Sequence, residues 1–430
     1  MNEVKSKIIK RGIKSHIVET DLFKTNVISI YFTVPLTKKD VTKNSLLTLL
    51  IKNGGKKYPT QYDVSRALDK MYGAYLSFGV AKRGDNQVIR FYIDTIKDNY
   101  TFDREDLLEN AFELLFDIIF NPNTDENGYF DSNIIELEKN NLKNVLESSK
   151  DDKDSYAFDR CLEEMYNHDG FGLNQYGILE DVDSISKEDL KEAYEKIIKE
   201  AKIDIFISGN INEKKIDEML NNSKWINDLN ERDGIFINFD EEKESSTNTQ
   251  KVEEKLAIVQ GKLVIGIDAC NRIPNYRSVG LVFNAILGDG PNSKMFQNVR
   301  EKEGLAYSAR SNFIYQKMNI FIRLGIMQKN YDKALSLSLK QIDDIKVGKF
   351  SDEDLENAKT YLIAGIRSLK EDQDAILLFY YGKELSGDKV TLEEYEETIK
   401  KVTREDVIEF SKGISINTIY YLNAIEEIGE

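Results

Sequence analysis

The chain has 430 residues, enough for two or three domains, and 41% of them are hydrophobic, which provides sizeable cores and excludes a disordered chain. The formal net charge is −16, and no run of Lys and Arg is longer than a pair such as Lys56-Lys57, so nucleic acid is not an expected partner. Two distant cysteines, a charged N-terminus without an apolar leader, and apolar runs too short to cross a bilayer predict a cytoplasmic protein that does not enter a membrane.

The first part of the chain predicts a mixture of strands and helices. Residues 26–35 are rich in β-branched residues and predict a strand, and the apolar stretch 45–51 predicts a helix that Gly54-Gly55 ends. The further elements, in chain order, are a capped helix from Thr60 to Gly73, strands over 74–82 and 87–95, an amphipathic helix over 105–120, mainly helical sequence to about residue 200, and a strand over 203–209.

Residues 231–251 interrupt this pattern with a polar, aperiodic sequence. They predict a linker between an N-terminal domain, residues 1–230, and a C-terminal domain, residues 252–430. After the linker the order of elements repeats, with a strand over 262–268, helices over 278–287 and 293–302, further strands, and an amphipathic helix over 331–347.

Two local matches favour an internal duplication. Gly73-Ala-Tyr75 follows a predicted helix, as does Gly304-Leu-Ala-Tyr307 in the second half. Ser186 and Thr403 are both predicted helix N-caps, each followed three residues later by an Asp, where the helix dipole favours negative charge.

Residues 284–308, NAILGDGPNSKMFQNVREKEGLAYS, are very similar to the peptidase M16 family, which includes insulinase, pitrilysin and mitochondrial processing peptidase. The resemblance extends in the same order over nearly the whole chain, and the stretch from Arg300 to Tyr307 is its most specific part. It implies an α+β fold of two homologous M16-type (LuxS/metallohydrolase-like) domains, each a mixed β-sheet packed by helices and joined by the linker. In the short M16B type, two such chains close as a clamshell.

Active members of that family carry an inverted zinc motif, His-x-x-Glu-His, on the first helix. Two His one turn apart share the metal, and the Glu between them handles the proton of the water. The alignment places Leu46 and Leu50 at the His positions, Leu49 at the Glu and Val145 at the distal metal ligand. We therefore predict no metal or other cofactor in this chain, and packing of these apolar residues in place of the site. This departure resembles the non-catalytic YmfF branch of the family.

Other metal and phosphate sites are not expected. A slip of a few residues would put Glu138 or Glu147 at the distal position, but no slip supplies histidines, because the chain has only His16 and His168. Both lie in polar sequence, and we expect both at the surface. The turn at residues 288–291, GDGP, lacks the lysine of a P-loop and the spacing of a dinucleotide-binding loop, so it predicts a turn between helices.

Arg300 and Tyr307 match an Arg–Tyr pair that contacts the bound peptide and the reacting carbonyl in active M16 proteins. A guanidinium offers fixed donors with permanent charge, and a phenol offers one hydrogen bond. From the residues alone, a salt bridge at a helix end and a packed tyrosine are the alternative. The resemblance favours substrate binding by both residues.

Two functions follow. In the first, the chain is the non-catalytic subunit of a heterodimeric M16B zinc metallopeptidase, in which a second M16 chain with an intact His-x-x-Glu-His motif carries the zinc. This chain then contributes peptide binding and an Arg300–Tyr307 half-site. In the second, it is a peptide-binding or scaffold protein, as a single chain or a homodimer, with no proteolytic complex, and a peptide adds as a strand to a sheet edge.

Overall fold

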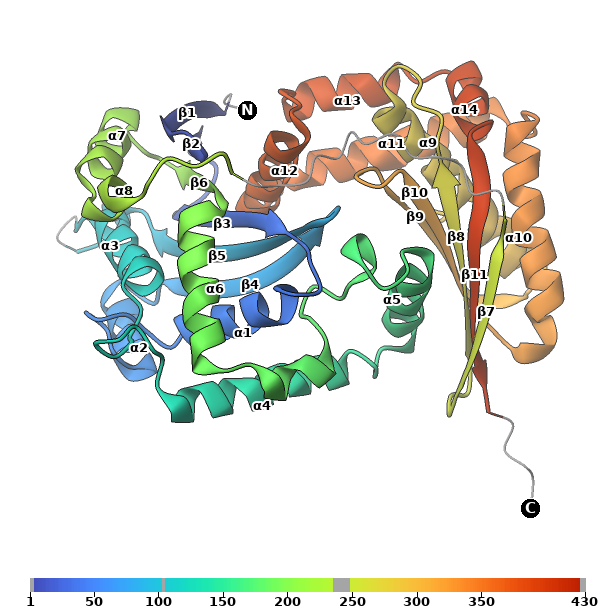
Figure 1. The fold of residues 1–430 in the computed structure, drawn as a ribbon. Helices are drawn as coiled ribbons and strands as arrows, with labels where there is room; N and C mark the ends of the chain where they lie inside the picture. Colours follow the sequence, from blue (N-terminus) through green and yellow to red (C-terminus); the bar gives the residue numbers. More distant parts are fainter. Residues whose placement is uncertain (1–3, 103–104, 235–247, 426–430) are drawn as a thin grey trace. The chain divides into compact units, whose positions relative to one another are not determined.

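The computed structural model describes residues 4–102, 105–234 and 248–425 and has the predicted α+β fold, with two mixed sheets packed by helices (Figure 1). The chain divides into two compact units. Unit 1 consists of residues 1–148, 173–238 and 372–389, and unit 2 of residues 149–172, 239–371 and 390–430. The units are not the continuous domains 1–230 and 252–430 expected from the sequence, because a segment of each half belongs to the unit of the other half.

The predicted linker, 231–251, falls mainly on residues 235–247, which lie outside the described residues. Its last two residues, Gln250 and Lys251, already belong to a strand of unit 2. That strand carries charged side chains at four of its seven positions, as suits a sheet edge, and for this reason its sequence resembles a polar linker.

Unit 1 contains a six-stranded sheet in the order β1-β2-β6-β3-β5-β4. Its strands are β1 (Lys5–Lys10), β2 (Ile13–Glu19), β3 (Thr25–Pro35), β4 (Tyr75–Arg83), β5 (Asn86–Ile96) and β6 (Lys202–Gly209). β2 and β6 are parallel, and all other neighbours are antiparallel. Because side chains alternate along a strand, Ile28, Ile30 and Phe32 of β3 face the main core of the unit.

Helices pack on that core face of the unit 1 sheet. They are α1 (Val41–Ile51), α2 (Gln61–Lys70), α3 (Leu107–Phe120), α4 (Ser132–Ser148), α6 (Lys187–Glu200), α7 (Glu213–Asn222) and α8 (Lys224–Asp228), with short helical turns η1 (Asp98–Tyr100) and η3 (Leu179–Ser184). Helix α1 has one charged residue, Lys43, and α4 and α6 pack against the helix, which buries both its apolar and most of its polar side chains.

Unit 2 contains a five-stranded sheet in the order β7-β11-β8-β10-β9. Its strands are β7 (Gln250–Leu256), β8 (Gly261–Ala269), β9 (Ala306–Ile314), β10 (Asn319–Ile326) and β11 (Ile414–Ala424). Its helices are α9 (Tyr276–Leu287), the wide π-type helix η4 (Met295–Lys302), α10 (Tyr331–Lys346), α11 (Asp352–Ser368), α13 (Leu392–Lys400) and α14 (Arg404–Ser411), with turns η2 (Gly170–Gly172), η5 (Gln328–Asn330) and η6 (Leu369–Glu371).

The two sheets share one topology. The order β2-β6-β3-β5-β4 corresponds to β7-β11-β8-β10-β9, with a parallel first pair and antiparallel neighbours after it in both units. Gly73 and Gly304 have φ angles of 75° and 61° just before the edge strands β4 and β9. Ser186 and Thr403 each form a capping box, at the starts of α6 and α14. The two local matches in the sequence therefore mark equivalent places in a duplicated domain.

Each sheet has a second face, covered by a helix from the other half of the chain. In unit 2, α5 (Lys153–Met165) packs on β8 and β11, on the opposite side of the sheet from α10 (Figure 1). Gly266 of β8 permits the close approach, because a Cβ there would lie 3.1 Å from Met165 Sδ. In unit 1, α12 (Gln373–Ser386) occupies the corresponding place, where Tyr381 stacks on Tyr31 of β3 at 3.9 Å.

α5 is the third α-helix after the β4–β5 hairpin and α12 the third after the β9–β10 hairpin, so the exchange is reciprocal. Cys161 lies within α5, and burial raises the pKa of its thiol. Both cysteines are free thiols, as the sequence predicts. Within the described ranges, no helix has the length and apolar character needed to cross a bilayer.

Candidate functional site

Helix α1 carries leucines at the positions where the family's zinc motif would lie, and leucine side chains have no atoms that bind a metal. Leu46 and Leu50 are buried in the core of unit 1, and Leu49 is partly buried against that core. Zinc binds nitrogen, sulfur or oxygen atoms, and an aliphatic side chain has none. The residues at these positions therefore do not fit a zinc ion.

Val145, at the position of the distal metal ligand, is not buried as we expected. Val145 is 37% exposed on α4 and so does not provide the buried packing that we expected in place of a metal ligand. Glu138 is instead buried on the same helix, where its carboxylate accepts hydrogen bonds of 2.9 Å from the Asn53 and Asn141 side chains. Asn53 follows the end of α1, so Glu138 links α4 to the C-terminal end of α1. Glu147 is exposed.

Arg300 and Tyr307 lie in unit 2, on η4 and at the start of the edge strand β9. The Arg300 guanidinium lies 4.6 Å from the centroid of the Phe296 ring and 3.5 Å from a carboxylate oxygen of Glu301. Tyr307 is 62% exposed, and none of the described residues hydrogen bonds with its hydroxyl. Both side chains are accessible to a ligand, although the described contacts include none between the two.

The turn at residues 288–291 joins α9 to η4, as predicted, and lies against strand β9. The backbone N–H of Ser311 donates to the Gly288 carbonyl at 2.9 Å, and a Cβ on Gly288 would lie 2.7 Å from Ser311 N, so only glycine fits there. A hollow of about 480 Å³ lies beside this turn. Its lining consists of residues 288–291, Phe296, residues 309–312 and Arg323.

The expectation for His16 is wrong. His16 is 1% exposed on β2, an internal strand between β1 and β6, and its ring stacks on Phe206 at 4.2 Å. Its Nδ1 lies 2.8 Å from Ser6 Oγ and its Nε2 lies 3.0 Å from Asp204 Oδ1. The expectation for His168 is confirmed, because its side chain is 56% exposed in a turn.

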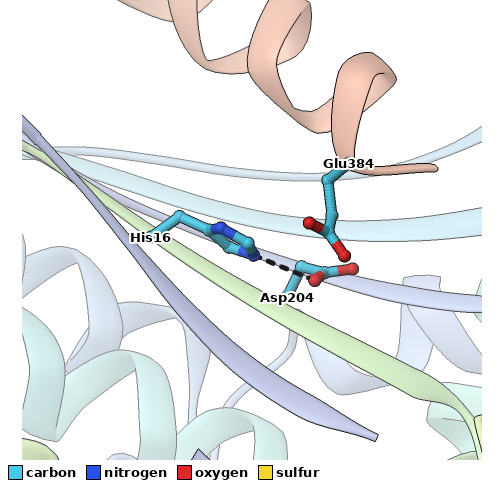
Figure 2. Close-up of side chains that lie close together, drawn as sticks. All are labelled: His16, Asp204 and Glu384. Carbon is cyan, nitrogen blue, oxygen red and sulfur yellow. Dashed lines mark hydrogen bonds and ion pairs between the residues drawn. The ribbon is translucent and has the colours of Figure 1, made fainter. Parts of the chain in front are cut away.

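His16, Asp204 and Glu384 form a cluster in unit 1 with possible metal-ligand atoms within 4.8 Å of one another. Figure 2 shows His16 and Asp204 on the sheet and Glu384 directed toward them from α12. Two ammonium groups already neutralise the carboxylates: Lys14 Nζ lies 2.6 Å from Glu384, and Lys202 Nζ contacts Asp204 and lies 3.2 Å from Glu384. A divalent cation would have to displace these lysines. The cluster is therefore an ion-pair network that fixes α12 to the sheet.

A family model described as "Peptidase M16 inactive domain" matches residues 184–362. The chain is 30% identical over 427 residues to "Probable inactive metalloprotease YmfF" of Bacillus subtilis (strain 168), a match that covers 99% of both chains. The chain belongs to the peptidase M16 family.

Solved structures show the M16 fold over the whole chain. The crystal structure of a conserved protein from Enterococcus faecalis V583 has a TM-score of 0.90 at 28% identity and covers 100% of both chains. That of a peptidase M16 inactive domain from Pseudomonas fluorescens has a TM-score of 0.77 at 16% identity, covers 98% of both chains, and shows likeness of fold. The family and fold predicted from the sequence are confirmed. With leucines at the motif positions, the chain is a non-catalytic M16 family member.

Sequence reasoning missed three charged residues of unit 2. Arg310 and Arg323 line the hollow from β9 and β10, and Asp154 of α5 contacts both. The two arginines are cross-strand partners in a hairpin, so the register of that hairpin was the signal that could have paired them. The position of Asp154 depends on the helix exchange, which no local pattern indicates.

Proposed function

We propose that this M16 member is the non-catalytic subunit of a two-chain zinc peptidase. A second M16 chain with an intact His-x-x-Glu-His motif would hold the zinc, and this chain would supply peptide binding and the Arg300–Tyr307 half-site. It would have no peptidase activity by itself. The observation that carries the proposal is the contrast between the leucines of α1 and the accessible, motif-matched pair in unit 2.

The exposure of Tyr307 supports a role in binding. Tyr307 is largely exposed at the start of an edge strand, so both its ring and its hydroxyl are accessible to a ligand. Its phenol can donate one hydrogen bond to a carbonyl oxygen that gains negative charge during peptide cleavage. Arg300, whose guanidinium is only partly used by Glu301 and Phe296, can hold a peptide carbonyl nearby. The partner's zinc would supply the activated water when the two chains are joined.

Co-purification of the chain from its native cell, with identification of the associated protein, is the first test. An M16 chain that carries the zinc motif is the expected partner. In the reconstituted complex, Tyr307→Phe should keep assembly and lower turnover about 10²–10³-fold, the usual effect of losing one oxyanion donor. Arg300→Lys should weaken peptide binding, because a flexible ammonium does not replace a planar fork.

Tyr62→Phe is the matched control, because Tyr62 is also an exposed tyrosine, on α2 of unit 1. It should leave turnover unchanged. If Tyr307→Phe and Arg300→Lys also leave cleavage unchanged while the zinc content stays constant, the half-site does not exist.

The alternative is a peptide-binding or scaffold protein without a peptidase partner. The edge position of β9 supports it, because an extended peptide can add to the edge of a sheet, here away from Ser311, whose N–H already donates to the Gly288 carbonyl. Peptide binding by the chain alone, with a second copy or no M16 partner in the native complex, would favour this alternative.

A further inference from the structure

Two arginines line the hollow in unit 2 from neighbouring strands. Arg310 of β9 and Arg323 of β10 are direct cross-strand partners. Like charges opposite each other on neighbouring strands destabilise a sheet. A single carboxylate, that of Asp154, contacts both guanidinium groups. Asp154 is therefore shared between two positive charges at the edge of this sheet, and Asp152 adds an electrostatic attraction to Arg323 without a direct contact.

The two guanidinium groups retain unused hydrogen-bond donors. The Arg310 side chain is 59% exposed and, among the described residues, hydrogen bonds only through Nη2, to Asp154. The Arg323 side chain is 12% exposed, and its Nε is buried without a hydrogen-bond partner among the described residues. Since an unpaired buried donor is costly, the pair favours a second acceptor.

Nearby acidic groups do not fill this need. Asp289 lines the same hollow, but it accepts a hydrogen bond of 3.1 Å from the Tyr361 hydroxyl, and burial raises the pKa of its carboxyl. Asp152 accepts hydrogen bonds from the backbone N–H groups of Asp154 and Ser155 and so caps helix α5. Neither carboxylate hydrogen bonds with the two arginines in the described part of unit 2.

We infer that this hollow binds a carboxylate carried by a peptide, with Arg310 as its main ligand and Arg323 behind it. A carboxylate matches the two parallel N–H groups of a guanidinium. Phe296, Pro291 and Ala309 give the hollow apolar walls for the adjoining carbon atoms. The inference rests on the peptide binding proposed above and adds the chemical class of the peptide.

The test uses the purified full-length chain and fluorescence anisotropy. The probe is a rhodamine-labelled hexapeptide of Leu and Ser with a free C-terminal carboxylate, compared with its amidated form and with an amidated form that contains one Glu. Both carboxylate-bearing peptides should bind about tenfold or more tightly than the peptide without a carboxylate, as expected for hydrogen bonds to a charged group. Arg310→Gln should remove this difference, and its exposed position should leave the fold intact.

Arg66→Gln, at an exposed arginine of α2, is the matched control and should keep the difference. Asp154→Asn should strengthen binding of the carboxylate peptides, because it releases both arginines from their present partner. Equal or absent binding of all three peptides, or a carboxylate preference that persists in Arg310→Gln, would overturn the inference. Competition by inorganic phosphate at lower concentrations than by succinate would also overturn it and assign the hollow to phosphate.

This measurement needs no second chain, so its failure leaves the two-chain peptidase proposal untouched. Conversely, a failure to find an M16 partner leaves the peptide-binding result standing.

Discussion

Replacing Asp204 by Asn tests whether the buried ion-pair network stabilises unit 1. Asp204 is fully buried, contacts Lys202 Nζ and lies 3.0 Å from His16 Nε2. The change keeps the side-chain shape but removes the charge. Breaking a buried ion pair by removing one partner costs about 3–5 kcal/mol. Because Lys202 retains Glu384 at 3.2 Å, we expect the lower end, about 3 kcal/mol.

The effect should depend on pH. Burial raises the pKa of Asp204, but the charge of Lys202 and the contact with His16 outweigh burial, and the pKa lies below its ordinary value. A carboxyl with a lowered folded-state pKa stabilises the fold above the unfolded-state pKa, and this contribution is lost as the pH falls through the folded-state pKa. The difference between the wild type and Asp204→Asn should therefore be full at neutral pH and shrink below about pH 4.

The chain has a single tryptophan, Trp225, in α8 of unit 1, so tryptophan fluorescence during urea unfolding reports on this unit. Asp217→Asn is the control, because Asp217 pairs with the exposed Lys7 at 2.8 Å and should cost less than about 1 kcal/mol. A loss below about 1 kcal/mol for Asp204→Asn, or a difference that does not shrink on acidification, would refute a stabilising role for the network.

Leu50→Ala should lower the free energy of unfolding by about 2–5 kcal/mol, measured through Trp225 fluorescence, and Leu49→Ala, at a partly buried neighbour, should lower it by less. An unchanged free energy of unfolding for Leu50→Ala would mean that this leucine does not stabilise the core. The purified chain should bind no stoichiometric zinc and cleave no peptide, and metal analysis that finds about one zinc per chain, with chelator-sensitive proteolysis, would contradict the alignment of α1. Limited proteolysis should cut first within residues 231–251, and early cleavage elsewhere would count against the sequence reading of that segment.

The sequence predicted the elements whose pattern is local and uniform. β3, β5 and β6 were expected within a residue or two, because apolar and β-branched residues dominate them. β1 and β7 were missed because charged side chains suit the edges of sheets and make these strands look like polar coil. His16 was misplaced because its strand, β2, was not recognised either, although β2 is an internal strand of the sheet.

Only the part of the candidate site that belongs to the family motif could be predicted from the sequence. Arg300 and Tyr307 were found by resemblance, and their accessibility needed the structure. Val145 and Glu138 lie two turns apart and so on nearly the same face of α4, which means that helical periodicity does not distinguish them, and their contrasting burial depends on how far along the helix that face is covered. Asp154 could not be placed beside Arg310 and Arg323, because capping and periodicity describe a helix but not the sheet that it covers.

The exchange of α5 and α12 sets an order of events during synthesis. All strands of the unit 1 sheet have been made once residue 209 is added, but the helix that covers Tyr31 and Phe206 begins only at Gln373. At a synthesis rate of about 5–20 residues per second, that face of the sheet stays uncovered for roughly ten to thirty seconds while the chain is still on the ribosome. A nascent chain that stops within this interval exposes aromatic rings together with the side chains of His16 and Asp204. Chaperones bind such surfaces, and proteins that leave them uncovered aggregate. A protein fragment of residues 1–230 lacks α12 altogether, so this face of its sheet would stay uncovered.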